Sequence, residues 1–285
     1  MTQITNINNT FESYQQLIDF YQEHKDKDFN TIHIEIRQWF AANMCATLGG
    51  ILDIFSDNIN TIVFDYIAHS IEQILLKNDF LSYFGHTRIV DNHHTTIRFL
   101  KLKLTDGKYF NNYVVDELIG RTELPKMSSL VKEKMTEAIY EIFVNAQIHS
   151  NSKNIYTCGQ FFPRDDKIEF TIVDTGIGFK RKINDRFNSN LSSIQAIKWA
   201  TEDRNTTKIG VTGGIGLALL KEFIEKNKGK MQIISDDGFY QFDCHGEQMR
   251  LFNGSFPGTI VNLQFKTNDT TSYVLSSEFS NNDIF

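Results

Sequence analysis

The chain contains few cysteines and no CxxC pair. Its three cysteines, Cys45, Cys158 and Cys244, lie far apart in a sequence of 285 residues. An odd number leaves at least one thiol unpaired, which favours a reducing compartment over a disulfide-stabilised secreted fold. We expect all three cysteines to be buried as free thiols.

Long apolar runs are also absent. No stretch approaches the ~18 apolar residues of a membrane span, and residues 1–9 lack a basic segment followed by an apolar run. The sequence accordingly predicts a cytoplasmic protein that does not contact a membrane. The formal net charge of −6 argues against an overall electrostatic attraction to nucleic acid, so no nucleic-acid partner is expected.

Two common nucleotide-binding motifs are missing. No Gly-x-x-x-x-Gly-Lys-Ser/Thr is present, which leaves a P-loop unsupported, and neither Gly-x-Gly has the third glycine of a dinucleotide fingerprint. Asp91, His93 and His94, with His86 nearby, are metal-ligand types. Adjacent histidines in a polar loop are usually solvated, and we expect that of these.

The composition is that of a folded protein. Hydrophobic residues make up 41% of the chain, and 24 phenylalanines supply ample apolar material for a core. The length favours two modest domains. The first 120 residues alternate predicted strands and helices, which is typical of a small α/β domain. Strands are expected at 32–36, 60–66 and 95–104, and helices at 11–23, 39–55, 70–84 and 111–119.

A linker is expected at residues 121–129. Pro125 interrupts both helical and strand periodicity, and Ser128 and Ser129 can cap a helix that follows. We therefore predict an N-terminal α/β regulatory domain at residues 1–124 and a second domain at residues 125–285.

The predicted helix at 130–150 has two distinct faces. One is an apolar stripe, and the other carries polar residues at intervals of four: Glu137, Glu141, Asn145 and His149. The side-chain oxygen of Asn145 suits Mg²⁺, and Glu141, one turn away, can orient or deprotonate a water or hydroxyl. The alternative is an ordinary solvated helix face. This alternative is favoured when the helix is considered without the motifs that follow it.

The strands predicted at 154–162 and 167–173 lead directly into Asp174-Thr-Gly176-Ile-Gly178. An acidic residue at a strand end can accept a hydrogen bond from an exocyclic amine. The two glycines let the backbone approach a flat ring without interference from Cβ atoms. This segment therefore predicts an adenine site.

A second glycine-rich segment contains Gly213, Gly214 and Gly216 and enters a helix predicted at 217–226. Its amide groups and the positive helix end can face a polyphosphate. The long, mostly polar stretch at 180–212, which contains one apolar helix at 191–200, suggests a mobile lid.

Three further strands are predicted near the C-terminus. Strands 230–235 and 239–243 are joined by an Asp236-Asp-Gly238 turn, and the last strand covers 260–265. Thr259, just before that strand, is a candidate second hydroxyl of the adenine site. The alternative is a strand-edge threonine.

In this order and spacing, four motifs resemble the GHKL superfamily: Glu141-x-x-x-Asn145-Ala-x-x-His149-Ser, Asp174-x-Gly176-x-Gly178, Gly214-x-Gly216-Leu217 and Gly258-Thr259. That superfamily comprises the ATP-binding domains of gyrase, the ninety-kilodalton heat-shock chaperones, MutL, histidine kinases and anti-sigma-factor kinases. The resemblance covers about residues 128–266.

The resemblance implies a two-layer α/β sandwich, with helices over one face of a mixed, mainly antiparallel sheet and with ATP between helices and lid. It implies that Glu141 is a base, Asn145 a Mg²⁺ ligand and Asp174 the adenine reader supported by Thr259. Further implied positions are the ring-side loop of Gly176 and Gly178 and the phosphate-closing residues Gly214, Gly216 and Leu217. His149 is expected to be structural.

Three activities are compatible with the resemblance. Mg²⁺-dependent ATP hydrolysis or an ATP-gated signalling switch ranks first. A Ser/Thr protein kinase of the anti-sigma-factor type, acting on a partner protein, is the first alternative, and a non-enzymatic nucleotide-binding interaction module is the second. A histidine kinase is disfavoured, because the preceding domain alternates strands and helices instead of forming a helical hairpin with a phosphoacceptor histidine.

The N-terminal domain faintly resembles STAS-type regulatory domains, although no motif residue carries that likeness. Members of the GHKL superfamily often dimerise through the region that precedes the ATPase. A protein partner or substrate and a homodimer are therefore expected.

Overall fold

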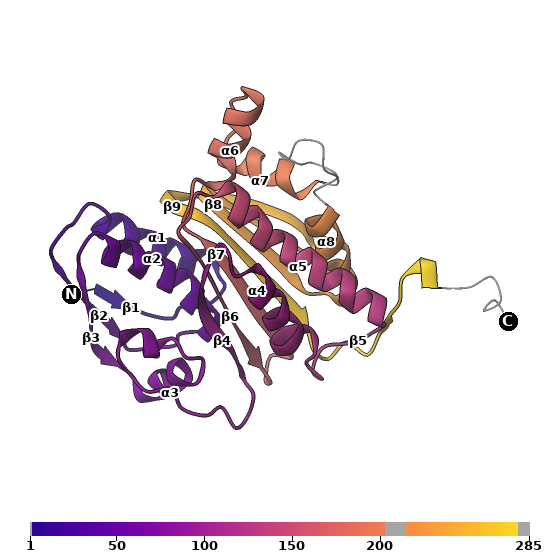
Figure 1. The fold of residues 1–285 in the computed structure, drawn as a ribbon, viewed down its shortest axis with the longest axis horizontal. Coiled ribbons are helices and arrows are strands. Elements are labelled where there is room, and N and C mark those ends of the chain that lie inside the picture. Colours follow the sequence, from indigo (N-terminus) through magenta and orange to yellow (C-terminus); the bar gives the residue numbers. More distant parts are fainter. Residues whose placement is uncertain (1, 203–214, 279–285) are drawn as a thin grey trace.

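The computed structural model describes residues 2–202 and 215–278 (Figure 1). A five-stranded sheet has the strand order β4-β6-β7-β9-β8, and every pair in it is antiparallel. A smaller parallel sheet has the order β1-β2-β3. The two sheets and their helices confirm the predicted α/β class with a mainly antiparallel sheet.

The strands are β1 (Thr2–Ile4), β2 (Thr31–Ile36), β3 (Thr61–Ile67), β4 (Thr96–Lys103), β5 (Lys126–Met127), β6 (Asn154–Phe162), β7 (Lys167–Asp174), β8 (Lys230–Asp243), β9 (Gly246–Lys266) and β10 (Ser272–Tyr273). The α-helices are α1 (Phe11–His24), α2 (Cys45–Asp57), α3 (His69–Lys77), α4 (Gly107–Val114), α5 (Ser129–His149), α6 (Gly178–Phe187), α7 (Ser193–Thr201) and α8 (Ile215–Asn227). Within these described ranges, no helix combines the length and the apolar character that crossing a membrane requires.

The five-stranded sheet is buried on both faces. Successive residues of β7 enter different cores: Ile172 packs in the core with α4, α5 and α8, whereas Val173 packs in the core with α1, α2 and the parallel sheet. Figure 1 shows the N-terminal elements and α5 on opposite sides of this sheet. The alternation of side chains along a strand thus supplies apolar contacts to both layers.

Strand β4 precedes the predicted boundary at 124/125, yet it pairs with β6, with Leu102 opposite Ile155. Helix α4 packs on α5 through Phe110 and Phe143, whose ring centroids are 4.7 Å apart. Residues 96–119 therefore complete the sheet and helical layer of the C-terminal region. The division of the chain into two domains stays a prediction.

Strand β8 reverses direction within its own length. Gln232 Nε2 donates to Gln241 Oε1 at 2.8 Å, whereas a straight strand would separate these two residues by about 30 Å. The pairing with β9 shifts at Asp236, whose φ of 54° is left-handed. The chain therefore turns at 236–238, in agreement with the predicted turn, and the two halves of β8 lie side by side.

Two sequence expectations in this region are wrong. Strand β9 begins at Gly246, well before the predicted start at residue 260, because its first half pairs with the second half of β8. Cys45 and Cys158 are buried as expected, but Cys244 is exposed. It lies in the reversal between β8 and β9.

A buried polar network joins the N-terminal layer to the sheet. Asn43 Nδ2 donates to Thr171 Oγ1 at 3.0 Å, and the Thr171 hydroxyl donates to Asn262 Oδ1 at 2.8 Å. Asn262 Nδ2 donates at 2.8 Å to Oε2 of Glu169, whose side chain is fully buried and also lies 3.1 Å from Lys167 Nζ. These contacts compensate for taking a carboxylate out of water.

We predict that Asn262→Ala lowers the free energy of unfolding by about 2–3 kcal/mol, because it leaves the Glu169 carboxylate and the Thr171 hydroxyl short of partners. Urea unfolding at pH 7 measures this loss. The matched control is Asn112→Ala, at an exposed position of α4. Equal stability of the two variants would contradict a stabilising role for the network.

Candidate functional site

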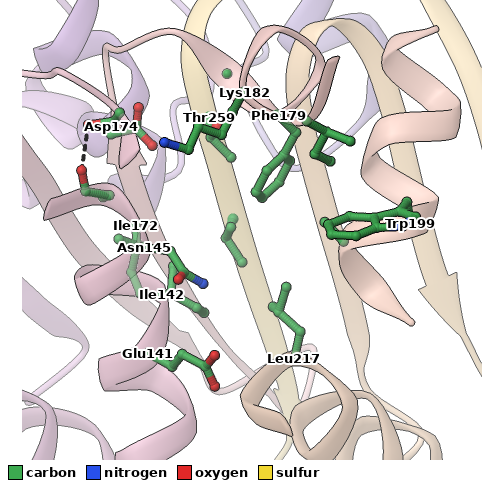
Figure 2. A pocket seen from close by; sticks show the side chains of 16 residues that line it. Glu141, Ile142, Asn145, Ile172, Asp174, Phe179, Lys182, Trp199, Leu217 and Thr259 are labelled. Atoms are coloured by element: carbon green, nitrogen blue, oxygen red, sulfur yellow. Dashed lines mark hydrogen bonds between the residues drawn. The ribbon is translucent and has the colours of Figure 1, made fainter. Parts of the chain in front are cut away.

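A pocket lies between α5 on one side and α6 and α7 on the other, above the adjacent strands β7 and β9. It encloses about 930 Å³ of space, part of which is open to solvent. Six predicted site residues from five elements line it: Glu141, Asn145, Asp174, Gly178, Leu217 and Thr259. Figure 2 shows the five of them that carry labels, Gly178 being unlabelled. The fold therefore brings together residues that the sequence separates widely.

Helix α5 supplies one wall of the pocket. Its N-cap is Ser128, as predicted, and the Ser128 hydroxyl accepts the N–H of Val131 at 3.1 Å. Glu141 and Asn145, one turn apart, point from α5 toward the pocket (Figure 2). Both are partly exposed there, while the neighbouring Ile142 is buried.

The carboxylate of Glu141 contacts the first turn of α8. Its Oε2 accepts the backbone N–H of Gly216 at 2.8 Å. A Cβ atom on Gly216 would lie only 2.5 Å from that oxygen and 3.1 Å from the carbonyl oxygen of Ala138. Glycine at this position therefore lets α8 approach α5 closely, with an anionic group at the helix N-terminus, where the helix dipole favours it.

Asp174 ends β7 directly opposite Thr259 of β9. The N–H of Gly176 donates to Asp174 Oδ1 at 2.9 Å. Burial raises the pKa of Asp174 to about 7, and hydrogen bonds from Gly176 and Thr259 only partly oppose that rise. The carboxyl group thus titrates near neutral pH at the end of the pocket.

Gly176 has a packing role. A Cβ on this residue would lie 1.8 Å from the carbonyl oxygen of Ser150, which accepts the N–H of Ile177 at 2.7 Å. Gly176 does not line the pocket, whereas Gly178 does. The predicted ring-side loop is therefore divided: Gly176 joins the loop to the end of α5, and Gly178 faces the cavity.

The turn of β8 holds the two helices that form the other wall. Ser235 Oγ accepts the N–H of Phe179, at the start of α6, at 2.8 Å. Ser193 Oγ, at the start of α7, donates to Asp237 Oδ1 at 2.5 Å. The side chain of Ser235 is fully buried and also lies 3.5 Å from the Thr259 hydroxyl. The start of α6 is therefore connected to the part of β9 that carries Thr259.

Helix α6 and three residues of this wall were not among the features predicted from the sequence. Phe179 and Lys182 come from α6, and Trp199 comes from α7 (Figure 2). Among the described lining residues, Lys182 is the only cation. The apolar positions Phe179, Ile183 and Phe187, spaced by four, were the available signal for α6.

Some predicted positions lie beyond what the structure describes. Gly213 and Gly214 fall in residues 203–214, outside the described ranges, and so does the end of the predicted lid. The side chain of His149 is likewise outside the description. Gly216 and Leu217 are described and are buried at the start of α8.

Residues 131–267 match the family model described as histidine kinase-, DNA gyrase B- and HSP90-like ATPase. This segment, a little under half of the chain, is therefore a domain of that family, and it contains all four motifs quoted above. No curated protein matches the chain. The family match does not extend into residues 1–130, so the likeness of the N-terminal region to STAS-type domains is unsupported, although a small α/β region is present there.

We predict that Asp174→Asn stabilises the ligand-free protein at pH 8 by roughly 2–4 kcal/mol and has little effect at pH 4. Its folded pKa, about 7, lies above the ordinary value of 3.8. The folded state therefore retains a proton that the unfolded state releases, and stability falls as pH rises through this window. Denaturant titrations at both pH values measure the difference.

The matched control is Asp116→Asn, which removes an exposed carboxylate before the linker. A stability difference between Asp174→Asn and wild type that is the same at pH 4 and pH 8 would contradict a neutral-range titration of Asp174.

Proposed function

We propose that this chain binds ATP with Mg²⁺ in the pocket and hydrolyses it. The observation that carries the proposal is the meeting of Glu141, Asn145, Asp174 and Thr259 around one cavity. That cavity lies in a domain whose family consists of ATPase-like proteins.

The Asp174 end suits adenine. An ionised carboxylate is an acceptor without a donor, and the exocyclic amine of adenine is a donor. Guanine presents a carbonyl oxygen at the equivalent position, which would face the carboxylate oxygens without a proton between them. The site therefore favours ATP over GTP, with the Thr259 hydroxyl beside Asp174 as a further polar contact.

The Glu141 and Asn145 end suits a magnesium-bound polyphosphate. Both side chains offer oxygen atoms, and none of the described lining residues offers a thiol or an imidazole. Oxygen ligands are those that Mg²⁺ prefers. The ion would neutralise phosphate charge when bound, and we assign the carboxamide oxygen of Asn145 as its protein ligand.

We assign Glu141 as the base. Its carboxylate accepts the Gly216 N–H at the N-terminus of α8, where an anionic phosphate also binds favourably. A phosphate oxygen that takes over this N–H would remove one hydrogen bond from Oε2, which makes the carboxylate a stronger acceptor for a proton from water. Phosphate binding and base activation would then be coupled through Gly216.

The second wall can limit access of water. Phe179 and Trp199 present aromatic surface, and Lys182 extends toward the same end of the pocket as Asp174 (Figure 2). A water-poor cavity strengthens the electrostatic contacts inside it. The turn of β8 holds the start of both helices and so sets the position of this wall.

We predict that Glu141→Gln reduces phosphate release from Mg·ATP by about 100-fold or more, because the amide cannot accept the proton of the attacking water. Binding of ATP, measured by calorimetry, should persist. The control is Glu137→Gln, one turn earlier on α5, where the carboxylate is exposed and paired with Lys134 at 2.6 Å.

Unchanged phosphate release in Glu141→Gln would remove Glu141 as the base. Transfer of label from ATP to a serine or threonine of a partner protein would support the kinase alternative, and tight binding with neither product would support a binding module. A protein partner and a homodimer stay predictions.

We predict that ATP affinity falls below pH 7 by up to about tenfold per pH unit, because protonation of Asp174 replaces the charge-assisted hydrogen bond from the adenine amine by a weaker one to a neutral carboxyl group. In the ligand-free protein, the pKa of Asp174 is about 7. Since the phosphates of ATP titrate in a similar range, the wild-type affinity is compared with that of Asp174→Asn at each pH. A constant ratio from pH 5 to pH 8 would contradict adenine recognition by the ionised group.

A further inference from the structure

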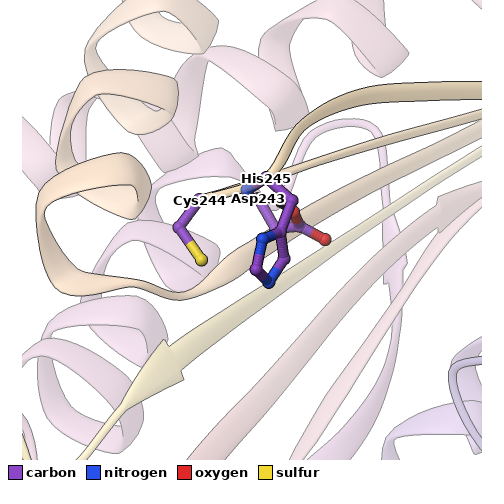
Figure 3. A group of neighbouring side chains, drawn as sticks. All are labelled: Asp243, Cys244 and His245. Atoms are coloured by element: carbon purple, nitrogen blue, oxygen red, sulfur yellow. Dashed lines mark hydrogen bonds between the residues drawn. The ribbon is translucent and has the colours of Figure 1, made fainter.

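Away from the pocket, the tip of the hairpin between β8 and β9 gathers three different metal-ligand types. Asp243, Cys244 and His245 each offer one ligand atom, and the three atoms lie within 4.8 Å of one another (Figure 3). Over residues 2–202 and 215–278, no other group of three or more such side chains is found. None of the three residues lines the ATP pocket.

Convergence of three consecutive side chains is a property of the reversal. Along an extended strand, neighbouring side chains point to opposite faces, so three in a row cannot meet. Here Asp243 Oδ1 accepts the backbone N–H of His245 at 2.8 Å, and Gly246 has a φ of 102°. The turn accounts for aspartate and glycine at these positions, but it does not require a cysteine or a histidine between them.

The carboxylate of Asp243 is held in orientation by a neighbour. Gln241 Nε2 donates to Asp243 Oδ2 at 2.9 Å, in addition to the His245 N–H on Oδ1. Each carboxylate oxygen has two acceptor sites, so both oxygens retain capacity for a cation. Hydrogen bonds of this kind are typical around metal ligands, because they fix a ligand before the metal arrives.

The ligand set selects the class of metal. Thiolate, imidazole and carboxylate together suit Zn²⁺, whereas Mg²⁺ and Ca²⁺ prefer oxygen ligands alone. In a tetrahedral zinc site, the sulfur and nitrogen ligands are separated by about 3.6 Å. The ligand atoms of the tip, which lie within 4.8 Å of one another, would have to move closer together to bind the ion. Cys244 and His245 are exposed, so their side chains can rotate to shorten this distance without disturbing a core.

We propose that the β8–β9 tip is a zinc site, in which Cys244 Sγ, a ring nitrogen of His245 and the Asp243 carboxylate bind Zn²⁺. Three protein ligands leave the fourth position open to water or to a group from another molecule. This site is independent of the proposed ATPase: it would exist whether or not the pocket hydrolyses ATP.

The other cysteines provide an internal reference. Cys45 and Cys158 are buried, and burial raises the pKa of both thiols above the ordinary range. Cys244 is the exposed thiol of the chain, so a thiol reagent applied to the folded protein reports on this residue. Protection of that thiol by a metal is therefore a direct readout of binding at the tip.

The experiment titrates the full-length, chelator-treated protein with Zn²⁺ alone by calorimetry, and with Co²⁺ while recording thiolate-to-metal charge-transfer absorption. We expect one Zn²⁺ per chain and slower reaction of Cys244 with a disulfide reagent when Zn²⁺ is present. Cys244→Ser and His245→Gln should each weaken binding by about tenfold or more.

His93→Gln is the matched control, because His93 is an exposed histidine in a loop outside the tip, and it should leave the zinc affinity unchanged. ATP affinity should be the same in Cys244→Ser and in wild type. Lack of stoichiometric Zn²⁺ binding by the wild type, or undiminished binding by a Cys244→Ser/His245→Gln double variant that retains its thermal stability, would overturn the proposal.

Discussion

The antiparallel pairing of β7 with β9 is the constraint on which the candidate site depends. Its register places Asp174, the last residue of β7, opposite Thr259. The approach is so close at this end that a Cβ on Gly258, whose φ is 113°, would lie 2.1 Å from the Asp174 carbonyl oxygen. Because the sheet is packed on both faces, the strands cannot slide, and the two polar side chains are held at one end of the pocket.

Strand β7 carries two buried carboxylates whose environments differ. Glu169 is fully buried but has Lys167 and Asn262 as partners. Asp174 is also buried, yet its pKa is raised to about 7, because its hydrogen bonds do not compensate for lost hydration. The first arrangement stabilises the fold. In the second arrangement, the Asp174 carboxylate can still accept a hydrogen bond from a ligand in the pocket. We propose that the adenine amine donates it.

The region before the matched domain is packed into it over a broad surface. Strand β4 completes the sheet, and α2 reaches the loop after β7, where a Cβ on Gly50 would lie 3.1 Å from Thr175 Cγ2. The N–H of Thr175 also donates to Ser152 Oγ at 3.1 Å. A displacement of α2 relative to the sheet would therefore act directly on the residue between Asp174 and Gly176.

Elements with strong local periodicity could be predicted from the chain itself. Helix α5, with one apolar and one polar stripe, and the β6–β7 hairpin lie within one or two residues of their predicted bounds. Helix α6 was missed because most of its residues are polar, and its start is held by Ser235, a distant residue on β8. The pairing of β4 with β6 was equally invisible, since no local pattern specifies which strand is the neighbour of another.

The sequence by itself determined which side chains are candidates for a functional site, among them Glu141, Asn145 and Asp174, because residue type and helical or strand spacing are local properties. Only the tertiary structure decided that these residues meet Phe179 and Trp199 in one cavity. It also decided that Gly176 serves packing and that Cys244 is exposed. Such outcomes depend on contacts between segments far apart in the chain, and burial and pKa follow from those contacts.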